Sequence, residues 1–191
     1  MGRVECGWLL RLGRELLQTV CVVDSLTGQP VPDITIEPEP IDSPEARWAL
    51  DRYVADLNER FPGGFDTSRA APPDPGDFVP PNGVFLLVRA EGETAGCGAL
   101  RTESGGIAEI RRMWISPRLR GRGAGRRLLA ALETHAREYG CSRVRLDTAA
   151  ELEEARALYA SAGYVEIDAY NENSYARHWF EKDVGRRSSV S

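Results

Sequence analysis

The sequence predicts an α/β (α+β) fold in which a mixed, mostly antiparallel twisted sheet of about seven strands is flanked by helices. Three observations predict it. Residues 83–115 contain short apolar stretches separated by glycine-containing turns, which indicates consecutive antiparallel strands. Residues 44–61 and 126–139 have the apolar spacing of amphipathic helices. A strand that follows the second of these helices implies a parallel crossover, so the sheet is mixed.

The chain has 191 residues, which suggests one domain with a substantial core. We expect residues 1–33 to form a poorly ordered or loosely docked N-terminal extension, residues 34–184 to form the domain, and residues 185–191 to form a polar tail. No apolar run in the chain approaches the length that spans a bilayer, so no membrane association is expected.

The domain begins with a strand and a helix. Ile34–Ile36 are strand-like, and prolines that follow them end the strand. Ser43 is a predicted helix cap with Pro44 at the first helical position, and an apolar stripe continues to Phe61. Residues 62–81 are rich in proline, aspartate and glycine and predict a long loop. Because long loops in compact domains often serve binding, we expect this one to border the substrate.

Three strands follow in quick succession. They are predicted at Val84–Arg89, Thr94–Arg101 and Ala108–Ile115, and their short connections contain Gly92 and Gly105. Such short turns imply that the three strands pair antiparallel.

The last part of the domain alternates helices and strands. A helix that ends at a glycine cap, Gly140, leads to the strand Arg143–Thr148, and a second helix is predicted at Glu151–Ala162. Tyr164–Ile167 and Arg177–Lys182 are the final predicted strands.

The run from Arg120 to Arg127 (RGRGAGRR) lies between Pro117, which ends the third of the consecutive strands, and the helix that follows. Because Gly121, Gly123 and Gly125 lack a Cβ atom, the backbone can approach a ligand closely and direct consecutive N–H groups at it. The helix N-terminus adds about half a positive charge, and the flanking arginines add whole ones. These features predict an anion site, and a pyrophosphate is its natural ligand.

Two nucleotide motifs do not fit this turn. The phosphate-binding loop of nucleotide hydrolases needs a lysine that is absent here, and the dinucleotide pattern needs glycine at Arg126 or at Leu128. What remains, Arg120-x-x-Gly123-x-Gly125, resembles the Arg/Gln-x-x-Gly-x-Gly/Ala signature of the GNAT superfamily of acyl-CoA-dependent N-acetyltransferases. The predicted order of strands and helices also resembles the mixed-sheet plan of that fold, over Ile34 to about Val184.

The resemblance implies acetyl-CoA as co-substrate, with the glycine turn on its pyrophosphate. The predicted cofactor-binding residues are the turn and the strand that leads into it: Met113, Trp114, Ile115, Arg120, Gly121, Arg122, Gly123, Ala124, Gly125 and Arg126. Backbone groups of Met113–Ile115 can serve the pantetheine and the oxyanion if the neighbouring strand splays away after Pro117. A flexible solvated loop or an unspecific phosphate binder is the competing interpretation of the arginine-glycine run.

The resemblance also implies a base that neutralises the amine. Glu109 lies on the strand that leads into the turn, similar to the position of a glutamate base in several GNAT enzymes. The competing interpretation is a solvated strand charge paired with Arg111 or Arg143. His178 or a water relay are alternatives for the base.

Tyr159 resembles the family's tyrosine near the sulfur, where a phenol can protonate the leaving thiolate. A core tyrosine on an apolar helix face is the alternative. The family often has an asparagine seven residues earlier, where this chain has Leu152. Asn171, Asn173 and Tyr175 are predicted substrate-binding residues, although a hairpin loop explains the asparagines as well.

The composition of the chain indicates which classes of ligand and partner are not expected to bind it. The net charge is −5, from 24 basic and 29 acidic side chains, which disfavours a nucleic-acid binder. Cys6, Cys21, Cys97 and Cys141 form no Cys-x-x-Cys pair and are expected to be reduced thiols of a cytoplasmic protein. With two histidines in the chain, no metal site is expected.

The function that the resemblance implies is transfer of an acetyl group from acetyl-CoA to a primary amine of a small molecule, by direct attack through a tetrahedral intermediate. The alternative is a non-catalytic acyl-CoA-binding regulatory or interaction module of the same fold. The sequence does not determine the oligomeric state, and a homodimer is kept as one option.

Overall fold

The computed structural model describes residues 33–69 and 74–185. The compact unit that holds the sheet begins at Ile34. Nearly all of the predicted extension (residues 1–32 of 1–33) and most of the predicted tail (residues 186–191 of 185–191) lie outside the described residues, and both stay predictions. The described elements are β1 Ile34–Pro38, α1 Pro44–Arg60, η1 Thr67–Arg69, η2 Pro75–Phe78, β2 Gly83–Ala90, β3 Glu93–Glu103, β4 Ile107–Ile115, η3 Pro117–Leu119, α2 Ala124–Glu138, β5 Arg143–Thr148, α3 Glu153–Ser161, β6 Val165–Ile167 and β7 His178–Asp183.

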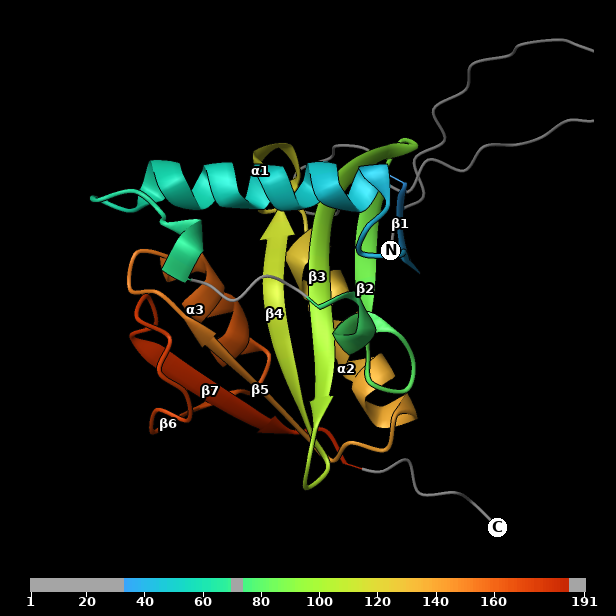
Figure 1. Ribbon diagram of the computed structural model, residues 1–191, viewed down its shortest axis with the longest axis vertical. Helices are drawn as coiled ribbons and strands as arrows, with labels where there is room; N and C mark the ends of the chain where they lie inside the picture. Colours follow the sequence, from blue (N-terminus) through green and yellow to red (C-terminus); the bar gives the residue numbers. More distant parts are fainter. Residues whose placement is uncertain (1–32, 70–73, 186–191) are drawn as a thin grey trace, which may run out of the picture. The chain divides into compact units, whose positions relative to one another are not determined.

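The seven strands form one sheet in the order β1-β2-β3-β4-β5-β7-β6 (Figure 1). Strands β1 to β4 pair antiparallel, β4 and β5 pair parallel, and β7 pairs antiparallel with both β5 and β6. The predicted mixed, mostly antiparallel sheet is therefore confirmed, including the parallel crossover through α2.

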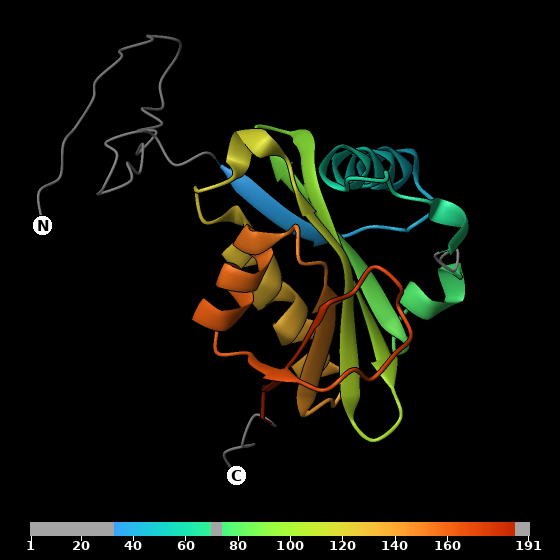
Figure 2. The same cartoon turned by 90° about the vertical axis from the view of Figure 1, so that its left-hand side faces the viewer.

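The sheet separates two helical layers (Figure 2). Because side chains alternate across a strand, Leu86 and Val88 of β2 join the core under α2, whereas Phe85 and Leu87 join a smaller core under α1. Helix α1 crosses one end of its face of the sheet, so much of that face is covered by the segments that follow α1 and β6 (Figures 1 and 2).

Helix ends follow the predicted capping residues. The Ser43 side chain accepts a hydrogen bond from the Ala46 N–H at 3.1 Å, with Pro44 at the first helical position. Gly140 has φ +80°, the left-handed conformation expected after the end of α2. Helix α3 is shorter than predicted, since it begins at Glu153 after Leu152, which makes no side-chain cap.

The sheet opens between β4 and β5. Their parallel pairing covers only Ile107–Glu109 with Arg143–Arg145, so the strands separate from Ile110 onward. We expected the separation to follow Pro117, and this was wrong, because it begins about seven residues earlier. Within β4 a β-bulge lies opposite Gly98, and Arg112 has φ +53° there. Bulges bend a strand and increase its twist, so this one turns β4 further from β5 beyond the point where their pairing ends.

Two of the four cysteines lie among the described residues. Cys97 and Cys141 are free, buried thiols, and Cys6 and Cys21 lie outside the described residues. Within residues 33–69 and 74–185, no helix has the length and apolar character needed to cross a bilayer.

Candidate active site

The glycine turn presents backbone N–H groups at the start of α2. Gly121 and Gly123 have φ of +74° and +77°, values that favour glycine, and open space surrounds the position of a Cβ at either residue. The first intrahelical bond runs from the Arg127 N–H to the Gly123 carbonyl at 3.0 Å. The N–H groups of Ala124–Arg126 precede it and have no acceptor within the helix. The turn therefore has the exposed donors that an anion requires.

The arginine side chains of the turn contact the protein itself. The Arg120 guanidinium donates to Asp56 at 2.7 Å and to the Ile115 carbonyl at 3.2 Å. Arg126 donates to the Ser161 hydroxyl at 2.8 Å. We predicted these arginines mainly as charges beside the ligand. In this structure they also brace the turn against α1 and α3, because carboxylate and hydroxyl acceptors lie within reach.

The first of two cavities, which we call the glycine-turn cavity, has a volume of about 330 Å³. Of the ten predicted cofactor-binding residues, its lining includes eight: Met113, Trp114, Ile115, Arg120, Gly121, Gly123, Gly125 and Arg126. Arg122 and Ala124 do not line it. Ala124 is buried in the core under α2, and only its backbone N–H, at the helix start, is suited to a ligand.

The second cavity, the carboxylate cavity, has a volume of about 750 Å³ and lies on the α1 face of the sheet. Glu109 and Asp147 line it together with three arginines and an aromatic wall from the segments after α1 and β6. Phe65 belongs to the long loop, so the described part of that loop borders the cavity, as expected. Both cavities share the lining residues Tyr53, Leu57, Met113, Leu152, Ala155 and Tyr159, so they form one continuous groove.

Glu109 lies in the floor of the carboxylate cavity. Its side chain is buried, at 5% exposure, and accepts a hydrogen bond from the Tyr170 hydroxyl at 3.1 Å. Arg101 lies 3.2 Å from the carboxylate and Arg111 lies 3.8 Å from it. The competing interpretation of Glu109 as a solvated charge was therefore wrong, because its side chain is buried. Of the two arginines named as its partners, Arg111 lies beside Glu109, whereas Arg143 pairs with a glutamate of β7.

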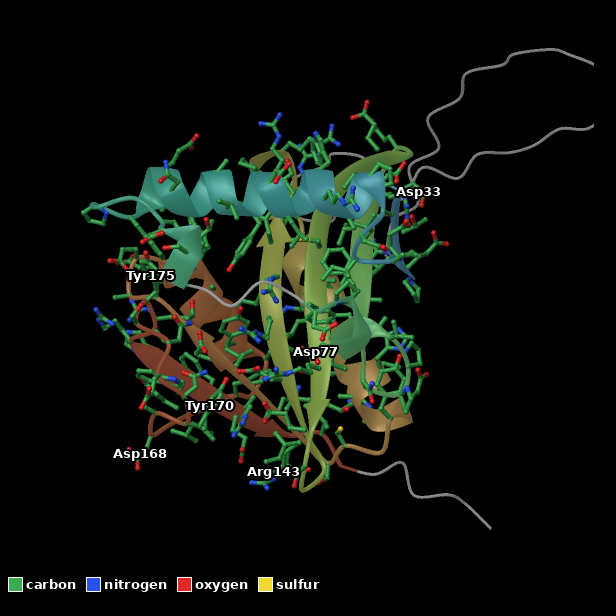
Figure 3. The ribbon with its side chains drawn as sticks, in the orientation of Figure 1. Asp33, Asp77, Arg143, Asp168, Tyr170 and Tyr175 are labelled. Carbon is green, nitrogen blue, oxygen red and sulfur yellow. The ribbon has the colours of Figure 1, made fainter. Side chains whose placement is uncertain are left out.

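Tyr170 was missed by the sequence analysis as a site residue. Its hydroxyl holds Glu109, and the Arg145 guanidinium lies 3.9 Å from the centroid of its ring. Burial raises the pKa of Tyr170, and the nearby charge of Glu109 raises it further, so the hydroxyl stays a donor. Figure 3 shows Tyr170 in the segment between β6 and β7, at a distance from Tyr175, which lies near the C-terminal end of α1.

Tyr159 lines both cavities. Its hydroxyl points to the Met113 sulfur at 4.0 Å, and its ring packs on Tyr164 and Phe180. The ring is thus part of the core, as the alternative interpretation held, while the hydroxyl reaches the groove. Burial raises the pKa of Tyr159, and the negative charge of Asp147 contributes, so the phenol stays protonated at neutral pH.

The three predicted substrate residues line the carboxylate cavity, but their polar groups are engaged. Asn171 and Asn173 donate to the Asp147 carboxylate at 2.7 and 2.8 Å. The Tyr175 hydroxyl accepts from the Asp66 N–H at 2.8 Å, and its ring lies among the aromatic residues of the wall. The sequence offered no signal for Asp147, because only the fold brings β5 beside the β6–β7 segment.

His178, an alternative base, lies outside the groove. Its two ring nitrogens contact Glu166 at 2.7 Å and Arg156 at 3.1 Å, and the ring stacks on Phe180. It lines neither cavity. Among the described side chains, no group of three or more His, Cys, Asp or Glu residues could hold a metal ion.

Comparisons with known proteins agree on one family. A model of the acetyltransferase (GNAT) family matches residues 50–164, more than half of the chain. The IAA acetyltransferase of Azospirillum brasilense is 35% identical over 122 residues, which are 61% of this chain and 72% of that protein. The aminoglycoside N(6')-acetyltransferase type 1 of Stenotrophomonas maltophilia is 32% identical over 93 residues, 44% of this chain and 61% of that protein.

A solved structure from Klebsiella pneumoniae subsp. pneumoniae, proposed to be an acyl-CoA N-acyltransferase, superposes with a TM-score of 0.64 at 28% sequence identity. The match covers 79% of this chain and 97% of that chain. An open mixed sheet with a glycine turn before α2 defines the class of acyl-CoA-dependent N-acyltransferases. This chain belongs to the GNAT family of acetyltransferases, whose members use acetyl-CoA. The predicted family, fold and enzyme class are confirmed.

Proposed function

We propose that the protein transfers the acetyl group of acetyl-CoA to a primary amine of a small molecule, by direct attack through a tetrahedral intermediate. The observation that carries this proposal is the continuous groove. One end has the glycine turn, the other has buried and half-buried carboxylates, and Met113 and Tyr159 lie where the two ends meet.

The glycine-turn cavity is the place for the donor. The N–H groups of Ala124–Arg126 suit the pyrophosphate, and the edge of β4 that leaves β5 offers main-chain groups of Met113–Ile115 to the pantetheine. Acetyl-CoA supplies the thioester whose carbonyl carbon is attacked. The fit rests on the unpaired start of α2 and on the open space beside Gly121 and Gly123.

The acceptor must lose a proton before it attacks. A primary amine with a pKa near 10.4 is neutral in only about one molecule in a few thousand at pH 7. Glu109 accepts that proton, directly or through a water, while Tyr170 and Arg101 keep its carboxylate in place. The two guanidinium groups near Glu109 also disfavour an ammonium ion there, which helps the amine to stay neutral.

The leaving group needs a proton in turn. As the tetrahedral intermediate collapses, the bond between carbon and sulfur breaks and the new amide bond remains. The Tyr159 hydroxyl, protonated at neutral pH, donates its proton to the departing thiolate, and the proton that the nitrogen loses as it becomes an amide restores the hydroxyl. The contact of this hydroxyl with the Met113 sulfur at 4.0 Å supports the assignment of a sulfur-bearing group to this part of the groove.

A small-molecule acceptor is supported by the size of the carboxylate cavity, about 750 Å³, which is in the range of small-ligand sites. The relative from Stenotrophomonas maltophilia is named for an aminoglycoside, also a small molecule. Absence of nucleic-acid and membrane partners, a cytoplasmic location and a homodimer remain predictions.

The proposal is tested with purified protein, acetyl-CoA and a panel of small amines, with thiol release measured against time and the products identified by mass spectrometry. We expect thiol release that depends on the amine and yields its N-acetyl product. The Gly123→Glu variant is the matched control and should release no thiol above background. Binding of CoA without acetylation of any amine would instead indicate a non-catalytic module.

A further inference from the structure

Asp147 lies on β5 and lines the carboxylate cavity, yet the proposed chemistry does not use it. Two asparagine side chains hold it. Asn171 donates to one carboxylate oxygen at 2.7 Å and Asn173 donates to the other at 2.8 Å. We call this arrangement the asparagine clamp, meaning Asn171 and Asn173 together.

The clamp is itself fixed, so its amide groups are oriented. The Asn171 side-chain oxygen accepts from the Trp179 indole at 2.9 Å, and the Asn173 side-chain oxygen accepts from the Tyr175 N–H at 3.1 Å. Since both amide oxygens are occupied, both NH₂ groups face Asp147. Each carboxylate oxygen has about two acceptor positions, so the clamp leaves Asp147 able to accept further donors from the cavity.

Charge distinguishes Asp147 from Glu109. Glu109 is flanked by Arg101 and Arg111, whereas the two groups that hold Asp147 are neutral amides. In the part of the chain that the structure describes, Asp147 makes no ion pair with Lys, Arg or His. Among the described lining residues, none of the three arginines pairs directly with Asp147, so a cationic ligand can form the ion pair that this carboxylate lacks.

The wall beside the clamp is aromatic. The rings of Phe61, Phe65 and Tyr175 lie with centroids 4.8 to 5.9 Å apart, and all three line the same cavity. Aromatic faces accommodate methylene chains and attract ammonium groups. A ligand with an aliphatic chain between charged nitrogens fits such a wall.

The two carboxylates suit two different nitrogens. A carboxylate without a neighbouring cation stabilises the ammonium form of an amine and so opposes deprotonation, whereas the guanidinium groups at Glu109 have the reverse effect. We propose that Asp147 binds a second nitrogen of the acceptor, which stays protonated during the reaction. The acceptor is then a diamine or polyamine whose other nitrogen reacts beside Glu109. This inference rests on the proposed function and names its substrate class.

The test uses diamines with three to six methylene groups, each compared with the amino alcohol of the same length. Calorimetry with CoA-loaded protein should show at least one diamine that binds at least about tenfold more tightly than its amino alcohol, because a charged hydrogen bond is lost in the alcohol. The Asp147→Asn variant should lose this preference. Asp168→Asn, an exposed change in the β6–β7 segment outside the cavity, should keep it.

Equal binding of every pair by the unaltered protein would overturn the inference, and so would a preference that survives in Asp147→Asn. The comparison on the unaltered protein needs no variant, so a folding defect in Asp147→Asn leaves the inference falsifiable. Because binding is measured apart from turnover, the two proposals separate. A diamine preference without acetylation refutes the proposed function alone, and acetylation of monoamines with no diamine preference refutes this inference alone.

Discussion

The two ends of the groove are built in different ways. The glycine-turn cavity depends on the main chain of one continuous stretch, in which Gly121 and Gly123 adopt left-handed conformations before α2. The carboxylate cavity takes its side chains from elements that are distant in the sequence, with Arg101 on β3, Glu109 on β4 and Asp147 on β5. Binding of the donor by main-chain groups requires one short glycine motif in the sequence. Binding of the acceptor depends on separate side chains, each of which can be substituted on its own. This difference explains why the donor is easier to predict from the sequence than the acceptor.

The largest effect is expected from Gly123→Glu. A side chain is strained at φ +77°, and a carboxylate would repel a pyrophosphate at the helix start. We expect CoA affinity, measured by calorimetry, to fall about 100-fold or more. Gly105→Glu is the matched control, since Gly105 has the same φ of +77° and open space but lies in the β3–β4 turn. Equal loss in both variants would mean that backbone strain, and not the site, causes the effect.

Glu109→Gln tests the other end of the groove. We expect kcat to fall about 100-fold with the best amine, because the proton acceptor is removed, while CoA affinity stays unchanged. Steady-state kinetics over a range of pH measures both quantities. Glu103→Gln is the control, since Glu103 pairs with Arg101 in the same ion network but does not line the cavity. Full turnover of Glu109→Gln with an unaltered pH profile would assign the base elsewhere.

Tyr159→Phe tests the point where the two cavities meet. Thiols are moderately acidic, so the loss of the proton donor should lower kcat by only about tenfold. Tyr164→Phe removes the hydroxyl of a neighbouring buried tyrosine that lines neither cavity, and it should leave kcat unchanged. Rapid-quench measurement of acetyl transfer distinguishes a slower chemical step from slower product release. Equal rates of acetyl transfer in the Tyr159 and Tyr164 variants would mean that Tyr159 is a core residue and not the proton donor.

The smallest effect is expected from Gly125→Ala, which separates the three glycines of the turn. Gly125 lies within α2, and an added Cβ would meet the Leu158 side chain at 3.4 Å, an ordinary contact. The KM for acetyl-CoA should rise about threefold at most, because the methyl group only narrows the cavity. Gly121→Ala, at φ +74°, should weaken CoA more than Gly125→Ala does. The opposite order would show that space, and not backbone conformation, selects glycine here.

Much of the fold followed from local patterns in the sequence. Strand spacing, the Ser43 cap and the Gly140 stop are set by neighbouring residues, and the structure confirms the predicted order of elements. Side-chain partners were harder to predict, because they depend on register and on contacts across the sheet. Arg120 pairs with Asp56, 64 positions earlier, and the pairing of Glu109 with Arg101 requires the register of β3 on β4.

The carboxylate cavity shows the same limit. Tyr170, which directly precedes Asn171, and Asp147 were missed because each gains its role only when the β6–β7 segment folds over β5. The loop asparagines were predicted as direct substrate contacts, and that role remains a prediction. In the structure their amide groups donate hydrogen bonds to the Asp147 carboxylate.

The gap between β4 and β5 leaves main-chain groups of the sheet without a partner strand among the described residues. Past Glu109, β4 pairs with no described strand on its β5 side, although its other side stays paired with β3 up to Ile115. A molecule bound in that gap would contact both β4 and β5 and so connect the two parts of the sheet. A ligand that binds there to the folded chain also raises the free energy of unfolding, by an amount that grows with its affinity and its concentration.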